Sequence, residues 1–224
     1  MTSRSLRTRP VVVALVGIDG AGKTTAAHAL SRLLENSTPA LVLANYSGRR
    51  TMLAWAARCG VSAPTRLLDA VESAVRTTNF IINHMRAFRF DGVVVMDRDL
   101  HCQRALRLAR GLPPGWFLGA MERILPTADA VVFLDVDPGE AHRRIVARGA
   151  DTETLQYLRG YRNGYLHLPG FERFHRVEAD GPLLGVLDEL EEIVAGVRGN
   201  RMAVPNSRVW SGTSAEHDRK FLRV

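Results

Sequence analysis

A short stretch near the N-terminus has the residue types and the spacing that bind phosphate. It reads GIDGAGKT from Gly17 to Thr24 and fits the pattern G-x-x-x-x-G-K-[ST]. Glycine tolerates positive φ angles and has no Cβ, so the backbone N–H groups of such a loop can converge on an anion. We expect the following residues to bind ATP and Mg²⁺: Gly17, Asp19, Gly20, Ala21, Gly22, Lys23, Thr24 and Thr25.

The lysine of this stretch stands out because the chain nearly always uses arginine. Of 30 basic residues only two are lysines, and one of them is Lys23. An ammonium group is a compact point charge that fits between phosphate oxygens, whereas a guanidinium group is broad and planar. A phosphate site therefore accounts for the lysine, and the hydroxyl of Thr24 is the expected first ligand of Mg²⁺.

Charged residues follow two other apolar runs. Asp97 and Arg98 come directly after VVVM, and Asp135 and Asp137 end the run AVVFLDVD. Opposite charges directly after a buried run would be costly without a role, so we expect Asp97 and Arg98 to be functional, with Asp97 as a second metal ligand. For Asp135 and Asp137 we favour capping of the helix that begins near Pro138.

Strands and helices alternate along most of the chain. The apolar runs are continuous, as in strands that are buried on both faces of a parallel sheet. With right-handed crossovers, this alternation predicts an α/β fold, a three-layer sandwich of the P-loop NTPase type with a five-stranded parallel sheet and helices on both faces. The expected strands are 11–16, 39–46, 92–98, 129–138 and 173–181. The expected helices are 24–34, 49–59, 66–88, 100–110, 116–124, 139–148, 153–167 and 182–197.

Length and composition favour one domain with flexible ends. We expect a leader at 1–10, one folded domain at 11–198 and a basic tail at 199–224. No apolar run approaches the roughly 18 residues of a membrane span. Two cysteines do not form a disulfide framework, so we expect a cytoplasmic protein. The net charge of +7 is spread along the chain, which favours a small phosphorylated partner over nucleic acid.

Four segments, in this order, resemble the thymidylate kinase family. They are GIDGAGKTT (17–25), MDRDLHCQRAL (96–106), LDVDPGEAHRRIVARG (134–149) and YLRGYRNGYLHL (157–168), and the likeness spans about residues 10–197. The resemblance implies an enzyme that uses ATP and Mg²⁺ to phosphorylate a nucleoside monophosphate, thymidylate or a related pyrimidine nucleotide. It also implies that residues 11–198 form a P-loop kinase domain with a short lid at about 148–156, and that the chain forms a homodimer.

The resemblance assigns roles to individual residues. Lys23 and Thr24 would hold the ATP phosphates and Mg²⁺, and Asp19 would bind metal or the acceptor sugar. The remaining roles are acceptor phosphate binding for Arg98, a place beside the acceptor base for Arg76, reading of the base edge for Gln103, an acceptor-site position for Tyr165, and a clamp on the transferring phosphoryl group for Arg148.

The acceptor half departs from the family pattern. Glu72 stands where the family has an aromatic residue that stacks on thymine, and the lid reads Asp151-Thr152-Glu153-Thr154 where the family has Asp-Arg-x-Glu. Two alternatives therefore stay open. One is a kinase of a nucleoside, sugar or other small hydroxyl compound, with Asp97 or Glu72 as the base. The other is a regulatory protein that binds nucleotide without transferring phosphate.

Overall fold

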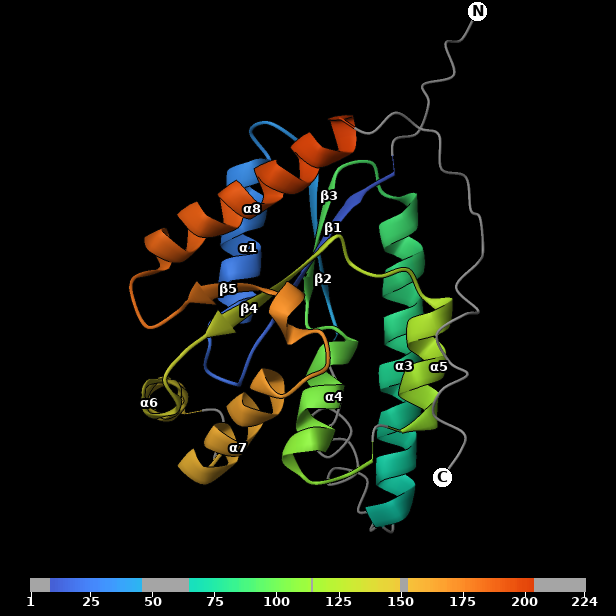
Figure 1. Ribbon diagram of the computed structural model, residues 1–224, viewed down its shortest axis with the longest axis vertical. Helices are drawn as coiled ribbons and strands as arrows, with labels where there is room; N and C mark the ends of the chain where they lie inside the picture. Colours follow the sequence, from blue (N-terminus) through green and yellow to red (C-terminus); the bar gives the residue numbers. More distant parts are fainter. Residues whose placement is uncertain (1–8, 46–64, 114, 150–152, 204–224) are drawn as a thin grey trace, which may run out of the picture.

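The computed structural model describes residues 9–45, 65–113, 115–149 and 153–203 (Figure 1). Within these ranges the side chains of residues 65–76, 116–117 and 202–203 are not described. Four predicted segments lie wholly or partly outside the described residues: residues 1–8 of the leader predicted at 1–10, the helix predicted at 49–59, lid residues 150–152, and residues 204–224 of the predicted tail.

Five parallel strands form the centre of the molecule, as predicted. They are β1 (Val11–Val16), β2 (Ala40–Ala44), β3 (Val93–Asp97), β4 (Ala130–Asp135) and β5 (His175–Glu178). Their order across the sheet is β2-β3-β1-β4-β5, so β1 has β3 on one side and β4 on the other. The register places Leu15 opposite Asp97, which brings the carboxyl end of β3 next to the loop that follows β1.

Helices cover both faces of this sheet. They are α1 (Lys23–Leu34), α3 (Thr65–Arg89), α4 (Leu100–Ala109), α5 (Trp116–Ile124), α6 (Pro138–Arg148), α7 (Leu155–Leu166) and α8 (Leu183–Ala203), with a 3₁₀ turn at Phe171–Arg173. Figure 1 shows α1 and α8 on one face, α3 and α5 on the other, and α4, α6 and α7 grouped at the carboxyl ends of the strands. None of the helices in the described ranges is both long enough and apolar enough to cross a membrane.

Asp135 and Asp137, which follow one another closely at the end of β4, have different roles. Asp137 accepts hydrogen bonds from the backbone N–H groups of Gly139 and Glu140, with Pro138 in the first turn of α6. This confirms the capping role predicted for Asp137. Asp135 instead lies buried at the end of β4 and pairs with Arg162 and Arg176, at 2.6 and 2.5 Å.

The last helix runs further than its sequence predicts. We expected its end at Val197, but α8 continues to Ala203. Arg201 explains the extension, because its guanidinium donates to the backbone carbonyls of Arg9 and Pro10 and pairs with Asp129. The final turns of α8 therefore hold the chain where it enters β1.

α4 and α7 touch at backbone distance. A Cβ on Gly164 of α7 would lie 2.2 Å from the carbonyl oxygen of Ala105 on α4, so only glycine allows this approach. One turn earlier, the hydroxyl of Tyr161 donates to the carbonyl of Cys102 at 3.0 Å. The helix that follows the Asp97–Arg98 motif and the helix that follows the lid thus form one packed unit.

Candidate active site

The glycine-rich loop between β1 and α1 is held by backbone contacts that leave no room for side chains. A Cβ on Gly17 would lie 2.6 Å from the carbonyl oxygen of Leu134, and one on Gly20 would lie 2.5 Å from that of Ala141. Gly20 also has a φ angle of +84°, which L side chains rarely adopt. The loop is therefore pressed against β4 and α6 in a conformation that needs glycine, as its sequence predicts.

Lys23 lies inside this loop. Its side chain is buried, and its Nζ donates to the carbonyl oxygens of Gly17 at 2.9 Å and Ile18 at 2.6 Å. Burial, together with the positive charge of Arg98, lowers the pKa of Lys23 from 10.5 to about 8. This environment thus disfavours the charged ammonium group relative to water. An incoming phosphate would supply negative charge that stabilises it.

Thr24 and Asp97 form a pair of oxygen ligands next to the lysine. The hydroxyl of Thr24 donates to Oδ2 of Asp97 at 2.5 Å. The carboxylate is buried, and its other oxygen, Oδ1, has no hydrogen-bond partner among the described residues. Mg²⁺ prefers such oxygen ligands and completes its shell with water and substrate phosphates. The residues present therefore fit the metal site predicted at Thr24 and Asp97.

Arg98 has a left-handed backbone, with a φ of +76°, and no other non-glycine residue in the described ranges has a positive φ. This conformation costs roughly 1–2 kcal/mol. Successive side chains of a regular strand point to opposite faces, but the left-handed residue breaks this alternation. As a result Asp97 reaches Thr24 while Arg98 reaches Asp19, with Nη2 and Oδ1 2.6 Å apart.

Asp19 is surrounded by positive charge. Burial alone would raise its pKa, but the charges of Arg98 and Lys23 lower it below its ordinary value. The charge of Arg148, which is exposed at the end of α6, lowers the pKa of Asp19 in the same direction. The structure thus brings together five of the predicted residues: Asp19, Lys23, Thr24, Asp97 and Arg98.

The resemblance assigned Tyr165 to the acceptor site, and the structure shows what its side chain contacts. Its side chain is fully buried, stacks on Tyr161 at 5.1 Å between ring centroids, and donates to the carbonyl of Gly17 at 3.3 Å. It packs beneath the phosphate loop, because α7 approaches α4 so closely that this face of α7 has no access to solvent. Tyr165 therefore supports the loop from below.

The remaining predicted residues lie on α4, α3 and α1. Gln103 is half-buried on α4. Glu72 and Arg76 fall on α3, but their side chains lie outside the described part of the chain. Thr25 is exposed in the first turn of α1, beside Thr24.

Three residues near the site were not predicted. Tyr157 on α7 is half-buried, and its raised pKa comes first from burial and then from the charge of Asp19. Its spacing of four residues from Tyr161 is a signal that could have placed it on this face of α7. Asn45 and Asn83 are buried amides joined to each other at 2.8 Å, and Asn45 also donates to the backbone carbonyl of Arg98.

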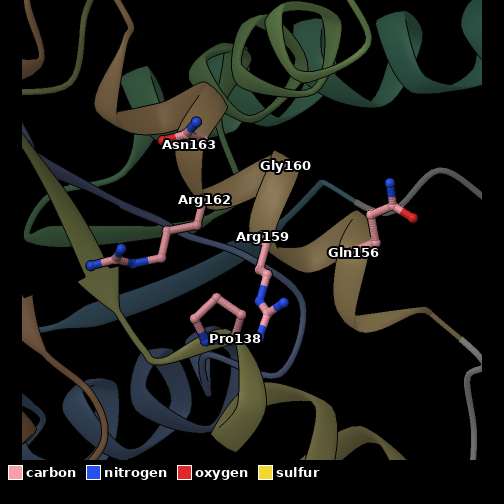
Figure 2. Close-up of a pocket in the computed structure, with 6 residues that line it drawn as sticks. All are labelled: Pro138, Gln156, Arg159, Gly160, Arg162 and Asn163. Carbon is pink, nitrogen blue, oxygen red and sulfur yellow. The ribbon is translucent and has the colours of Figure 1, made fainter.

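A separate cavity of about 440 Å³ lies between the start of α6 and the outer face of α7 (Figure 2). Figure 2 shows the side chain of Arg162 extending toward β4, where it pairs with Asp135, and Arg159 lying beside Pro138. None of the predicted site residues lines this cavity, which is formed by Pro138, Gln156, Arg159, Gly160, Arg162 and Asn163.

Comparison with known proteins gives one consistent result. A family model described as Thymidylate kinase matches residues 15–190. A thymidylate kinase of Xanthomonas campestris pv. campestris (strain B100) is 30% identical over 204 residues, 87% of each chain. One of Xanthomonas oryzae pv. oryzae (strain PXO99A) is 30% identical over 215 residues, 92% of each chain. A probable thymidylate kinase of Archaeoglobus fulgidus is 30% identical over 190 residues, 82% of this chain and 94% of the relative.

Proposed function

The chain belongs to the thymidylate kinase family of phosphotransferases, and we propose that it transfers the γ-phosphoryl group of ATP to a nucleoside monophosphate, thymidylate or a related pyrimidine nucleotide. One observation carries the proposal. The loop lysine, the Thr24–Asp97 pair and the Arg98–Asp19 pair meet at one edge of the sheet. Lys23 and Arg98 thus supply one cation for each of two phosphate groups.

Each residue has a distinct part in this reaction. Lys23 exchanges its carbonyl partners for the β- and γ-phosphates of ATP, and Arg98 holds the acceptor phosphate. Asp19 keeps the guanidinium of Arg98 in place through their 2.6 Å contact. Thr24 and Asp97 would hold Mg²⁺, which supplies positive charge to the phosphate oxygens as the phosphoryl group moves. Arg148, near Asp19, adds charge on the open side.

The state of Asp19 and Asp97, the two described carboxylates of the site, favours an acceptor that is already ionised. A hydroxyl acceptor needs a base that takes up a proton, within hydrogen-bond reach. Asp19 is a poor base, because neighbouring cations lower its pKa. Asp97 already accepts a hydrogen bond from Thr24 and is the proposed metal ligand. A phosphate oxygen carries its own negative charge and needs no base, which supports a nucleotide over an unphosphorylated compound.

An acceptor screen tests the proposal. Release of ADP would be measured with ATP, Mg²⁺ and, in turn, dTMP, other nucleoside monophosphates and unphosphorylated nucleosides. We expect turnover with dTMP or a related pyrimidine monophosphate. Turnover only with unphosphorylated acceptors would favour the hydroxyl-kinase alternative. Tight ATP binding without turnover on any acceptor would favour a nucleotide-binding regulatory protein.

We also propose that the chain acts as a cytoplasmic homodimer. One face of α3 exposes apolar side chains that are 40–50% accessible, at Ile81, Ile82, Met85 and Phe88. A row of this kind on one helix is typical of a protein–protein contact. Light scattering of the full chain should give twice the monomer mass, and Ile82→Glu together with Met85→Glu should return it to the monomer.

A further inference from the structure

The left-handed backbone of Arg98 is held on both sides by hydrogen bonds. Its N–H donates to the carbonyl of Leu15 on β1 at 3.1 Å, which continues the ladder between β1 and β3. Its carbonyl accepts from Nδ2 of Asn45 at 2.7 Å. The first bond belongs to the sheet, but the second comes from a side chain at the end of β2 and therefore depends on residue type.

Asn45 is in turn fixed by a second buried amide. Its Oδ1 accepts from Nδ2 of Asn83 on α3 at 2.8 Å, and the same Nδ2 donates to the carbonyl of Ala44 at 3.1 Å. Asn45 and Asn83 are 8% and 7% exposed, so neither amide is well hydrated and each needs partners within the protein. With its Oδ1 engaged by Asn83, Asn45 can present only its N–H₂ group to Arg98.

We infer that Asn83, acting through Asn45, is a positioning residue that holds Arg98 in its left-handed conformation and so aims the guanidinium at the acceptor phosphate. This inference rests on the proposed function, in which Arg98 binds that phosphate. Without the bond from Asn45, the backbone of Arg98 relaxes toward an extended conformation. Its side chain then turns away from Asp19, because successive residues of an extended strand point to opposite faces.

A purely structural role predicts a different outcome. If the two amides only tied α3 to β2, their loss would lower stability and reduce turnover evenly for both substrates. If they position Arg98, the loss falls on the acceptor and spares ATP, because Lys23 and Thr24 do not contact either amide.

The test replaces Asn83 with leucine, which has a similar volume and no hydrogen-bonding group. We expect kcat/KM for dTMP to fall about 10-fold while KM for ATP changes less than about 2-fold. The loss should vanish in an Arg98→Ala background, where nothing remains to be positioned. Asn163→Leu is the matched control, since Asn163 is exposed on α7, and it should leave both constants unchanged. Should Asn83→Leu fail to fold, Asn83→Ser replaces it, because the shorter side chain does not reach Asn45.

A crystal structure of the variant decides the inference independently of activity. A negative φ at Arg98 with the Asp19 contact broken supports it, whereas an unchanged φ with the contact intact overturns it. An equal loss for dTMP and ATP, or a loss that persists in the Arg98→Ala background, also overturns it. Absence of turnover by the wild-type protein with every acceptor would count against the proposed function, and the crystal structure would still decide the role of Asn83.

Discussion

Lys23→Met removes the buried ammonium of the phosphate loop and keeps a side chain of similar length. The pKa of Lys23 is lowered from 10.5 to about 8, and a shift of this size means that folding disfavours the charged lysine by about 3 kcal/mol at pH 7. Methionine loses two hydrogen bonds worth about 1 kcal/mol each. The abandoned carbonyls keep other partners, since Tyr165 donates to Gly17 and the N–H of Ala21 donates to Ile18, both at 3.3 Å.

The variant should therefore be more stable by about 1 kcal/mol, which for a chain of this length raises Tm by about 2–4 °C. This gain in stability depends on pH, because Lys23 titrates and methionine does not. Below pH 8 the wild-type lysine is charged in both the folded and the unfolded state, and the full penalty applies. Between pH 8 and 10.5 the folded state releases the proton first, so the penalty on the wild-type protein disappears, and the variant, which still lacks two hydrogen bonds, becomes the less stable protein by up to about 2 kcal/mol.

Thermal unfolding of both proteins from pH 6 to 10.5 measures this difference, and ADP release measures activity. We expect kcat/KM to fall more than about 100-fold, the loss of a charged contact to the transferring phosphate. Arg159→Met is a matched control at an exposed cation and should change neither Tm nor its pH dependence. A variant that is less stable at pH 7, a difference that stays constant with pH, or retained activity would refute the reasoning.

Three further predictions concern other contacts of the site and the sheet. Asp97→Asn should raise the Mg²⁺ concentration that gives half-maximal turnover about 10-fold, because it removes a charged ligand. An unchanged Mg²⁺ titration at fixed ATP would contradict the metal site. Gly20→Ala should lower the free energy of unfolding by about 1–3 kcal/mol in urea, since its Cβ would meet a carbonyl oxygen at 2.5 Å, whereas Gly119→Ala, with open space around it, should not. Asp135→Asn should cost about 1 kcal/mol at neutral pH, because two arginines lose their partner. The arginines lower the pKa of Asp135, so the difference in stability between the two proteins is full above about pH 4 and disappears as the pH falls through the lowered pKa. Thermal unfolding down to pH 3 measures this difference, and a difference that stays constant would contradict the reasoning.

The sequence predicts the donor half of the site because local patterns determine it. Gly17, Gly20 and Lys23 lie within one loop, and the apolar runs on either side of the motifs fix where the strands end. Asp97 and Arg98 are predictable for the same reason, since charge directly after a buried strand has few uses.

The rest of the site depends on contacts between distant segments. Asn45 and Asn83 are 38 residues apart, and amide side chains have no periodic signature that would pair them. Tyr165 matches a family position, but the match carries no information about how closely α7 approaches α4. The end of α8 was missed because Arg201 finds its partners at Arg9 and Pro10, about the whole length of the domain away in sequence.

The glycine contact between α7 and α4 has a consequence for how such a site changes during evolution. Gly164 meets the backbone of Ala105, and α4 directly continues the Asp97–Arg98 motif, so a substitution that separates the two helices disturbs the donor loop and the motif together. The described part of α3 packs on β2, and its Phe80 lies in one apolar cluster with Leu100 of α4 and with Leu118 and Met121 of α5. Glu72, where the chain departs from the family pattern, falls on α3 and not on α4 or α7, so the residue at this position can change while the glycine contact is kept.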